Sequence, residues 1–191
     1  MDMAIPQACG TWGVSPPWKI LWAKSDPRHP LWKHLLDAAA VSWVLPKPRI
    51  LAVEGSGTVA LWVGLHDIGK SDGSFQHQIP DFSQDLEREG YGRTGDARCR
   101  HERLSARFLR KKLAACGMTE RWVDTIARAV LAHHGYWDES ARDGSPAYAQ
   151  AQEALFQMLQ DVLKETLSPR VMPQDHSAFG MALAGHVVLC D

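Results

Sequence analysis

The feature that most constrains this sequence is the presence of histidine and aspartate side chains on helical faces that are otherwise apolar. His133 lies seven residues after Ile126 and His134 lies four residues after Val130, so both continue the apolar stripe of one predicted helix. A buried imidazole or carboxylate is costly unless it is paired or bound to a metal ion. Five histidines and two aspartates occupy positions that point to the core in this way: His34, His66, His101, His133, His134, Asp67 and Asp191.

Two explanations of these seven side chains are open at this point. Each can be satisfied separately, as a hydrogen-bonded core histidine or a capping carboxylate, or together they can bind metal ions. Imidazole and carboxylate donors without thiolate suit divalent Mn, Fe, Co, Ni or Zn better than Ca. The convergence of all seven on one core favours a metal centre.

Apolar residues at helical spacing predict an all-α domain. Gly117 and Gly135 stand where two of the helices are expected to end. The Pro-, Gly- and Trp-rich residues 1–30 predict an irregular leader, and the many Gly, Pro and polar residues of 71–99 predict a long loop. No segment shows the clean alternation of a strand. Helices are expected at 31–45, 58–65, 100–116, 119–134, 147–166 and 177–191.

Composition excludes several other classes of protein. Hydrophobic residues make up 45% and charged residues 23% of the chain, as in ordinary globular domains. The net charge of −1 means that an anionic partner must be held by a local patch. No apolar run is long enough to span a membrane, and the N-terminus does not resemble a signal peptide. Four scattered cysteines without a C-x-x-C pair argue against a zinc ribbon, so we expect a cytoplasmic protein without membrane contact.

The length of 191 residues suits one domain covering residues 1–191. The sequence stops within the apolar run MALAGHVVLCD at 181–191, which carries no signal for the end of a helix. We therefore expect a fragment, or a separately encoded domain, of a larger protein.

Six short segments together resemble a known family. In chain order they read LWAKS (21–25), HPLWKHLLDAA (29–39), GLHDIGKSDGSFQ (64–76), RHERLSA (100–106), LAHHG (131–135) and AGHVVLCD (184–191). They are similar to the HD-superfamily nuclease domain of the CRISPR-associated helicase–nuclease of type I systems. The HDIGK segment occurs in any HD phosphohydrolase, whereas the Phe75-Gln76 pair, the HERLSA segment and the His-His-Gly run favour the CRISPR branch.

The resemblance implies an α-helical HD bundle whose two-metal site cuts single-stranded DNA during CRISPR interference. It assigns one metal ion to His34, His66, Asp67 and Asp191, and the second to His101, His133 and His134, with Asp67 bridging the two. Asp67 and Lys70 would be the catalytic residues, with Lys70 facing the scissile phosphate. The implied cofactors are two divalent ions, with Mn, Fe, Co, Ni and Mg as candidates. The implied partners are single-stranded DNA, a helicase domain in the same or another chain, and a CRISPR surveillance complex.

Several surface and neighbouring residues allow two interpretations each. Arg103 and Arg107 lie on a basic helical stripe that is either a solvated face or a guide for the phosphate backbone of DNA. Asp37, three residues after His34, either orients that imidazole or lies in solvent. Trp137 either stacks on a base or packs in the core. His77, outside the motif, is expected to have no role in the site.

Alternative functions follow from other patterns in the same sequence. An HD-type phosphohydrolase acting on nucleotides, or a binding module with an incomplete site, would share the fold. Residues 64–71 also satisfy the P-loop pattern G-x-x-x-x-G-K-[ST], although no helix pattern follows and Asp67 would lie beside the phosphates. Residues 50–60 contain a lone match to the dinucleotide-binding fingerprint, for which a helix–helix connector is the preferred interpretation.

Overall fold

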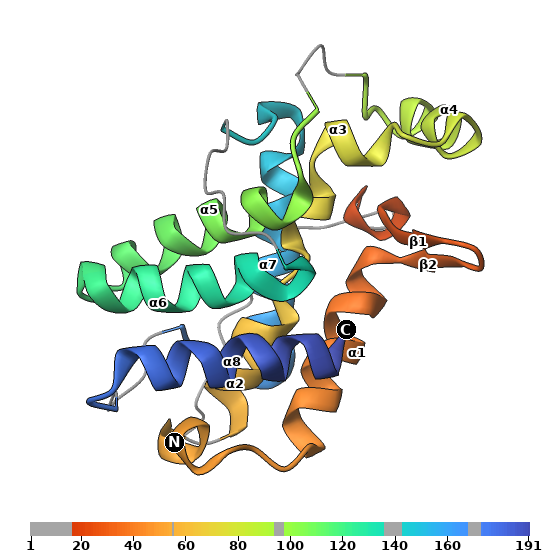
Figure 1. The fold of residues 1–191 in the computed structure, drawn as a ribbon. Helices are drawn as coiled ribbons and strands as arrows, with labels where there is room; N and C mark the ends of the chain where they lie inside the picture. Colours follow the sequence, from red (N-terminus) through yellow and green to blue (C-terminus); the bar gives the residue numbers. More distant parts are fainter. Residues whose placement is uncertain (1–16, 55, 94–97, 136–142, 168–172) are drawn as a thin grey trace, which may run out of the picture.

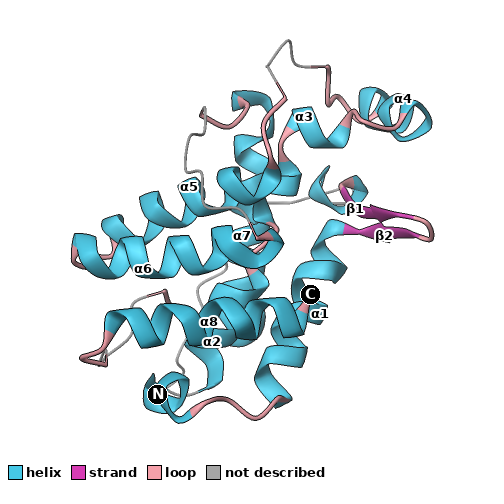
Figure 2. Cartoon of the chain, in the orientation of Figure 1, coloured by secondary structure: helices cyan, strands magenta, loops and turns pink. Residues whose placement is uncertain are grey.

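Eight α-helices dominate the computed structural model, which describes residues 17–54, 56–93, 98–135, 143–167 and 173–191. Figure 2 shows how little of this described chain is strand. The expected all-α class is therefore confirmed. No helix within these described ranges is both long and apolar enough to cross a membrane.

Helices α1 (Leu31–Val44) and α2 (Ser56–Gly64) pack closely against each other. One face of α1 is buried and carries His34 among its apolar residues. By contrast, α2 is apolar on all sides, and its Trp62 side chain is fully buried. A helix of that kind is stable only inside a core. The chain that leaves α2 therefore emerges in the interior, two residues before His66.

Helices α5 (His101–Ala115) and α6 (Glu120–Leu131) form a neighbouring pair, and α8 (His176–Cys190) packs against both α6 and α1 (Figure 1). Gly117, with a φ of 78°, makes the left-handed turn between α5 and α6. Helix α7 (Pro146–Leu163) has proline in its first turn and packs against α2 and the segment that follows it. These helices enclose a core of aliphatic side chains, each of which contributes about 1.5–3 kcal/mol when fully buried.

Two expectations about the irregular segments hold only in part. Part of the expected leader forms an antiparallel hairpin of strands β1 (Trp22–Ser25) and β2 (Arg28–Pro30). Part of the expected loop at 71–99 forms helices α3 (Gly73–Gln76) and α4 (Pro80–Arg88). The glycine and proline counts misled here because these residues begin helices instead of interrupting them. Asp72 caps α3 by accepting a hydrogen bond from the Ser74 amide at 2.9 Å.

Candidate metal centre

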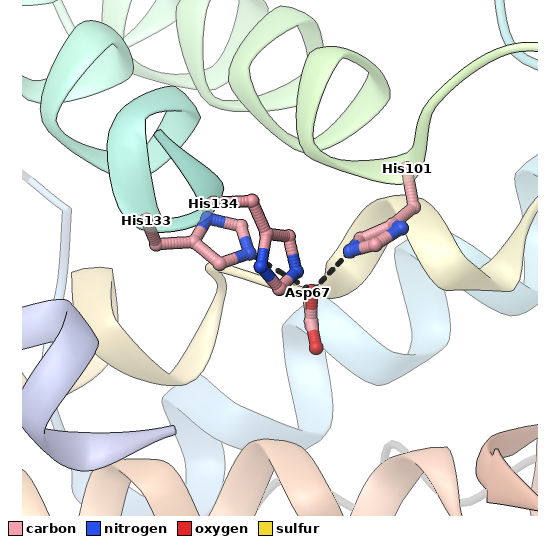
Figure 3. A group of neighbouring side chains, drawn as sticks. All are labelled: Asp67, His101, His133 and His134. Carbon is pink, nitrogen blue, oxygen red and sulfur yellow. Dashed lines mark ion pairs between the residues drawn. The ribbon is translucent and has the colours of Figure 1, made fainter. Parts of the chain in front are cut away.

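Asp67 lies at the centre of a cluster of imidazoles and has a fully buried side chain. Its Oδ1 atom lies 3.0 Å from the Nε2 atom of His101 and 3.5 Å from the Nε2 atom of His133. Figure 3 shows these two rings and that of His134 converging on the carboxylate from α5 and from the end of α6. One oxygen of Asp67 therefore faces three histidines.

The other oxygen of Asp67 faces a different set of side chains. Its Oδ2 atom lies 2.8 Å from the Nε2 atom of His34, 3.3 Å from that of His66 and 2.6 Å from the Nζ atom of Lys70. The Oδ1 atom of Asp191 lies 3.4 Å from His34 Nε2 and 3.5 Å from His66 Nε2. The carboxylate of Asp67 thus separates two donor groups and belongs to both.

The structure brings together all seven side chains that the sequence places on apolar faces. In each of two sets, one possible ligand atom per residue lies within 4.8 Å of all the others. The first set is His34, His66, Asp67 and Asp191, and the second is Asp67, His101, His133 and His134. This grouping is the same as the one that the family resemblance implies.

Two backbone carbonyls fix the orientation of the buried rings. His66 Nδ1 donates to the carbonyl of Val63 at 2.8 Å, and His133 Nδ1 donates to the carbonyl of Val130 at 2.5 Å. Because a carbonyl can only accept, Nδ1 of each ring carries a proton, and in the neutral form that can bind a metal ion the lone pair lies on Nε2. Both lone pairs then point at the cluster, as in metal sites where the outer nitrogen of the ligand is hydrogen-bonded.

Several buried atoms of the cluster form no hydrogen bond of normal geometry with the described residues. They are Asp67 Oδ1 and the Nε2 atoms of His66, His101 and His133. Each such atom costs free energy unless a partner satisfies it. Imidazole nitrogens and carboxylate oxygens facing a common point are the donors that a divalent transition metal accepts. The residues present therefore fit the pair of ions that the sequence predicts.

The electrostatics of the cluster favour added positive charge. Burial by itself raises the pKa of Asp67, but the charge of His66 and the nearby rings of His101 and His133 hold this pKa well below its ordinary value. The contact with His66 also holds the pKa of Asp191 below its ordinary value. Burial lowers the pKa of His66, but Asp67 and Asp191 together raise it to about 9. Both carboxylates are thus ionised. Their negative charge favours a cation at the cluster, which can be a protonated His66 or a metal ion.

A close approach of two backbones places His101 over Asp67. The short 3₁₀ helix Ile68–Ser71 lies directly against the first turn of α5, and the amide of Gly69 donates to Ser105 Oγ at 2.8 Å. A Cβ atom on Gly69 would lie 2.0 Å from the carbonyl oxygen of His101. Only glycine can occupy this position without moving α5.

His133 and His134 lie in a single 3₁₀ turn, Ala132–His134, that continues α6. Gly135 ends this turn with a φ of 76°, as its position in the sequence predicts. The ring of His134 is exposed, and its centroid lies 5.2 Å from that of His101. Partial burial and the neighbouring His133 and His101 lower the pKa of His134, which favours the neutral form that can act as a ligand.

The structure gives other roles to several residues weighed in the sequence. Asp37 pairs with His29 at 3.0 Å, so the interpretation that it orients His34 is wrong. The guanidinium of Arg107 pairs with Asp143, with a shortest distance of 2.7 Å, and Arg103 is half-buried on the same helix. A role of Arg103 and Arg107 in binding nucleic acid stays a prediction. Trp137 lies outside the described residues.

Sequence reasoning missed three residues that border the cluster. Glu102 is a buried carboxylate whose Oε2 atom lies 3.5 Å from His101 Nδ1. Gln76 is fully buried and donates to the carbonyl of Lys70 at 2.7 Å. Lys24 Nζ lies 3.7 Å from Asp191 Oδ1. All three lie inside segments that carry the family resemblance, HERLSA, GLHDIGKSDGSFQ and LWAKS, so each could have been suspected as a polar residue within a motif.

The two nucleotide-binding patterns lack the structure that they require. A P-loop joins a strand of a parallel sheet to a helix, but residues 64–71 follow α2 and form a buried 3₁₀ turn. Within the described ranges the one sheet is the antiparallel β1–β2 hairpin, so no βαβ unit surrounds residues 50–60 either. Both alternatives are excluded.

A helical bundle built around a buried His-Asp pair and further imidazoles defines an HD-type domain with a candidate metal centre. Comparison with protein families agrees with this class: the family described as Cas3, HD domain matches residues 22–191. The chain therefore belongs to the Cas3 HD domain family.

Known proteins of the same kind are similar to most of the chain. The CRISPR-associated endonuclease/helicase Cas3 of Thermus thermophilus is 36% identical over 132 residues, which are 61% of this chain and 14% of the relative. A crystal structure of a CRISPR-associated protein is 32% identical with a TM-score of 0.75, covering 92% of this chain and 22% of that one. The cas3 HD domain of Thermus thermophilus, crystallised in the presence of Ni²⁺, is 27% identical with a TM-score of 0.60. The match covers 90% of this chain and 75% of that domain's chain. The chain thus spans about one seventh of the curated relative.

Proposed function

We propose that this chain is a metal-dependent nuclease domain that cuts single-stranded DNA at a two-metal centre. The observation that carries the proposal is the position of Asp67. Its two oxygens face two separate sets of imidazoles, at 3.0 Å from His101 on one side and 2.8 Å from His34 on the other. A carboxylate shared in this way suits a pair of ions held close together, the arrangement used for phosphodiester cleavage.

Each residue of the centre has a distinct part in this proposal. When bound, divalent ions lower the pKa of water and stabilise negative charge on phosphodiester oxygens. His34, His66 and Asp191 would hold one ion, His101, His133 and His134 the other, and Asp67 both. The amine of Lys70 lies at the same place, with its Nζ atom 2.6 Å from Asp67 Oδ2 and 5.7 Å from the centroid of the Phe75 ring. That ammonium group can face the phosphate as negative charge develops on it.

The larger assembly belongs to the same proposal. The Thermus thermophilus relative is named an endonuclease/helicase, and it is much longer than the segment matched here. We therefore expect the centre to act on DNA delivered by a helicase, in the same chain or in a partner, during CRISPR interference. The candidate partners remain single-stranded DNA, that helicase and the surveillance complex that recruits it.

Cleavage of circular single-stranded DNA tests the proposal. The chain, stripped of metal with EDTA, should be inactive and should regain activity with Mn, Co or Ni but not with Ca. Asp67→Asn keeps the shape of the side chain and should lower the rate by at least about 100-fold, since it removes charge shared by both ions. Asp161→Asn is the matched control, because Asp161 is an exposed carboxylate on α7 that accepts a hydrogen bond from Gln157.

Two results would point to the alternative functions. Hydrolysis of nucleoside phosphates without cleavage of circular DNA would favour an HD phosphohydrolase acting on nucleotides. A chain that binds no metal and cleaves neither substrate would be a binding module. Cleavage that persists in the chelated, metal-free protein would contradict the proposed chemistry altogether.

A further inference from the structure

Lys24, on strand β1, is a basic side chain that contacts Asp191 at the end of α8. Its Nζ atom donates to the main-chain oxygen of Asp191 at 3.4 Å and lies 3.7 Å from the Oδ1 atom of the same residue. That Oδ1 atom is the one that faces His34 and His66. Lys24 therefore contacts the candidate metal ligand from its outer side.

Asp191 has the most exposed side chain of the four residues in its set. That side chain is 25% exposed, whereas those of His34, His66 and Asp67 are at most 5% exposed. The Asp191 amide donates to the carbonyl of Val187 at 3.1 Å, which orients the backbone but not the carboxylate. A side chain that borders solvent keeps rotamer freedom unless another group holds it.

The strand that carries Lys24 is firmly attached to the centre. The fully buried Gln76 accepts a hydrogen bond from the Trp22 amide at 3.1 Å and donates to the Trp22 carbonyl at 2.8 Å. The side-chain amide of Gln76 also donates to the carbonyl of Lys70 at 2.7 Å. The Trp22 ring also packs on Phe75, with centroids 4.6 Å apart. Strand β1 is thus bonded to the segment that contains Asp67.

The hairpin lies close to two residues of the same ligand set, His34 and Asp191. His29 pairs with Lys24 across the two strands, and its ring lies edge-on to that of His34, with centroids 6.2 Å apart. Figure 1 shows the hairpin beside α1 and above the C-terminal end of α8. One element, the hairpin, therefore borders both His34 and Asp191.

We propose that Lys24 is a positioning residue that holds Asp191 in the set His34, His66, Asp67 and Asp191. This inference rests on the proposed two-metal centre. Two effects of the lysine oppose each other: it orders the ligand, but its charge repels a divalent ion. If positioning dominates, removing Lys24 weakens metal binding at this set, and loss of an outer partner of a ligand typically costs about 10–100-fold in affinity. If repulsion dominates, removing it strengthens binding.

Calorimetric titration of Mn²⁺ into the metal-free chain separates the two effects. The wild type should bind two ions. Lys24→Met should leave one affinity unchanged and weaken the other roughly 10–100-fold, and Lys24→Arg should restore most of the loss. In an Asp191→Ala background, Lys24→Met should have no further effect. Lys33→Met is the matched control, because Lys33 is an exposed lysine on α1 whose amine lies 5.4 Å from the Trp32 ring centroid.

A second measurement does not depend on metal. In the metal-free chain, Lys24→Met should speed amide hydrogen exchange at Asp191 and leave exchange in the middle of α8 unchanged. Three results of the titration would each overturn the inference. Lys24→Met could leave both Mn²⁺ affinities unchanged, it could tighten the binding of an ion, or it could weaken binding equally in the Asp191→Ala background. A larger fall in melting temperature than in Lys33→Met would assign Lys24 a general structural role instead. A wild type that binds fewer than two ions would refute the two-metal proposal, and the exchange rate would still decide on Lys24.

Discussion

Replacement of Gly69 by alanine tests how the fold builds the proposed metal centre. The added Cβ atom would lie 2.0 Å from the carbonyl oxygen of His101, 2.7 Å from the amide nitrogen of Ser105 and 2.9 Å from Leu104 Cβ. All three atoms belong to the first turns of α5, and two of them are backbone atoms that cannot rotate away. To restore ordinary contact distances, the beginning of α5 must move by roughly 1.4 Å.

This movement has a cost that can be estimated. Overpacking a tight contact typically costs about 1–3 kcal/mol. The hydrogen bond from the Gly69 amide to Ser105 Oγ, 2.8 Å long, would also be lost, at about 1 kcal/mol. We expect Gly69→Ala to lower the free energy of unfolding by about 2–4 kcal/mol, which is a fall of roughly 5–15 °C in melting temperature for a domain of this size.

The same movement should damage one half of the centre selectively. His101 moves with the first turn of α5 and leaves Asp67 Oδ1, whereas His34 and His66 lie on other elements. Urea unfolding measures the stability, and Mn²⁺ titration should show weaker binding of one ion with the other retained. Gly92→Ala is the control, because a Cβ atom there would meet nothing within 4 Å. Gly69→Ala with wild-type stability and wild-type metal binding would refute this account of the close approach.

Three further substitutions test other parts of the structure. Gly185→Ala, on the exposed side of α8 with open space around its Cβ position, should raise the free energy of unfolding by about 1 kcal/mol without changing metal content; a loss of stability would contradict the helix geometry. His77→Ala should lower the free energy of unfolding by about 1–3 kcal/mol, because His77 Nε2 lies 2.7 Å from the hydroxyl of the buried Tyr148. Metal content should not change, and an unfolding curve like that of the wild type would disprove this role. Asp143→Ala should remove the ion pairs that Arg107 and Lys111 form with this carboxylate, so fluorescence anisotropy should show tighter binding of single-stranded DNA. The salt slope should be steeper by roughly 0.7 for each cation that contacts a phosphate, and unchanged affinity would mark the stripe as a solvated face.

The sequence predicted the long helices well, for a definite reason. Residues 100–116 and 119–134 correspond closely to α5 and to α6 with its 3₁₀ extension, because their apolar spacing is regular and glycine ends each one. The hairpin at Trp22–Pro30 was missed because strands of three or four residues are too short to show alternation. Local pattern is informative only where an element is long enough to repeat it.

Pairing between distant residues was beyond the sequence pattern. The basic stripe on α5 invited an interpretation as a surface for DNA, yet Arg107 pairs with a carboxylate 36 residues away and Lys112 with Glu153, 41 residues away. His77 shows the same effect, since its partner Tyr148 lies on α7. Whether a charged or polar side chain is satisfied depends on tertiary contacts, which periodicity does not contain.

The buried position of Asp67 follows from the helix before it, and the rest of the centre follows from Asp67. Helix α2 is apolar on every side, so it must run through the core, and a residue three positions past its end is still inside. A carboxylate held there needs partners from more than one direction. Helix α1 supplies His34 and the beginning of α5 supplies His101, while the ends of α6 and α8 supply His133 and Asp191. Helix packing and ligand geometry therefore constrain each other, and a displacement of one helix end should remove a ligand as well as stability.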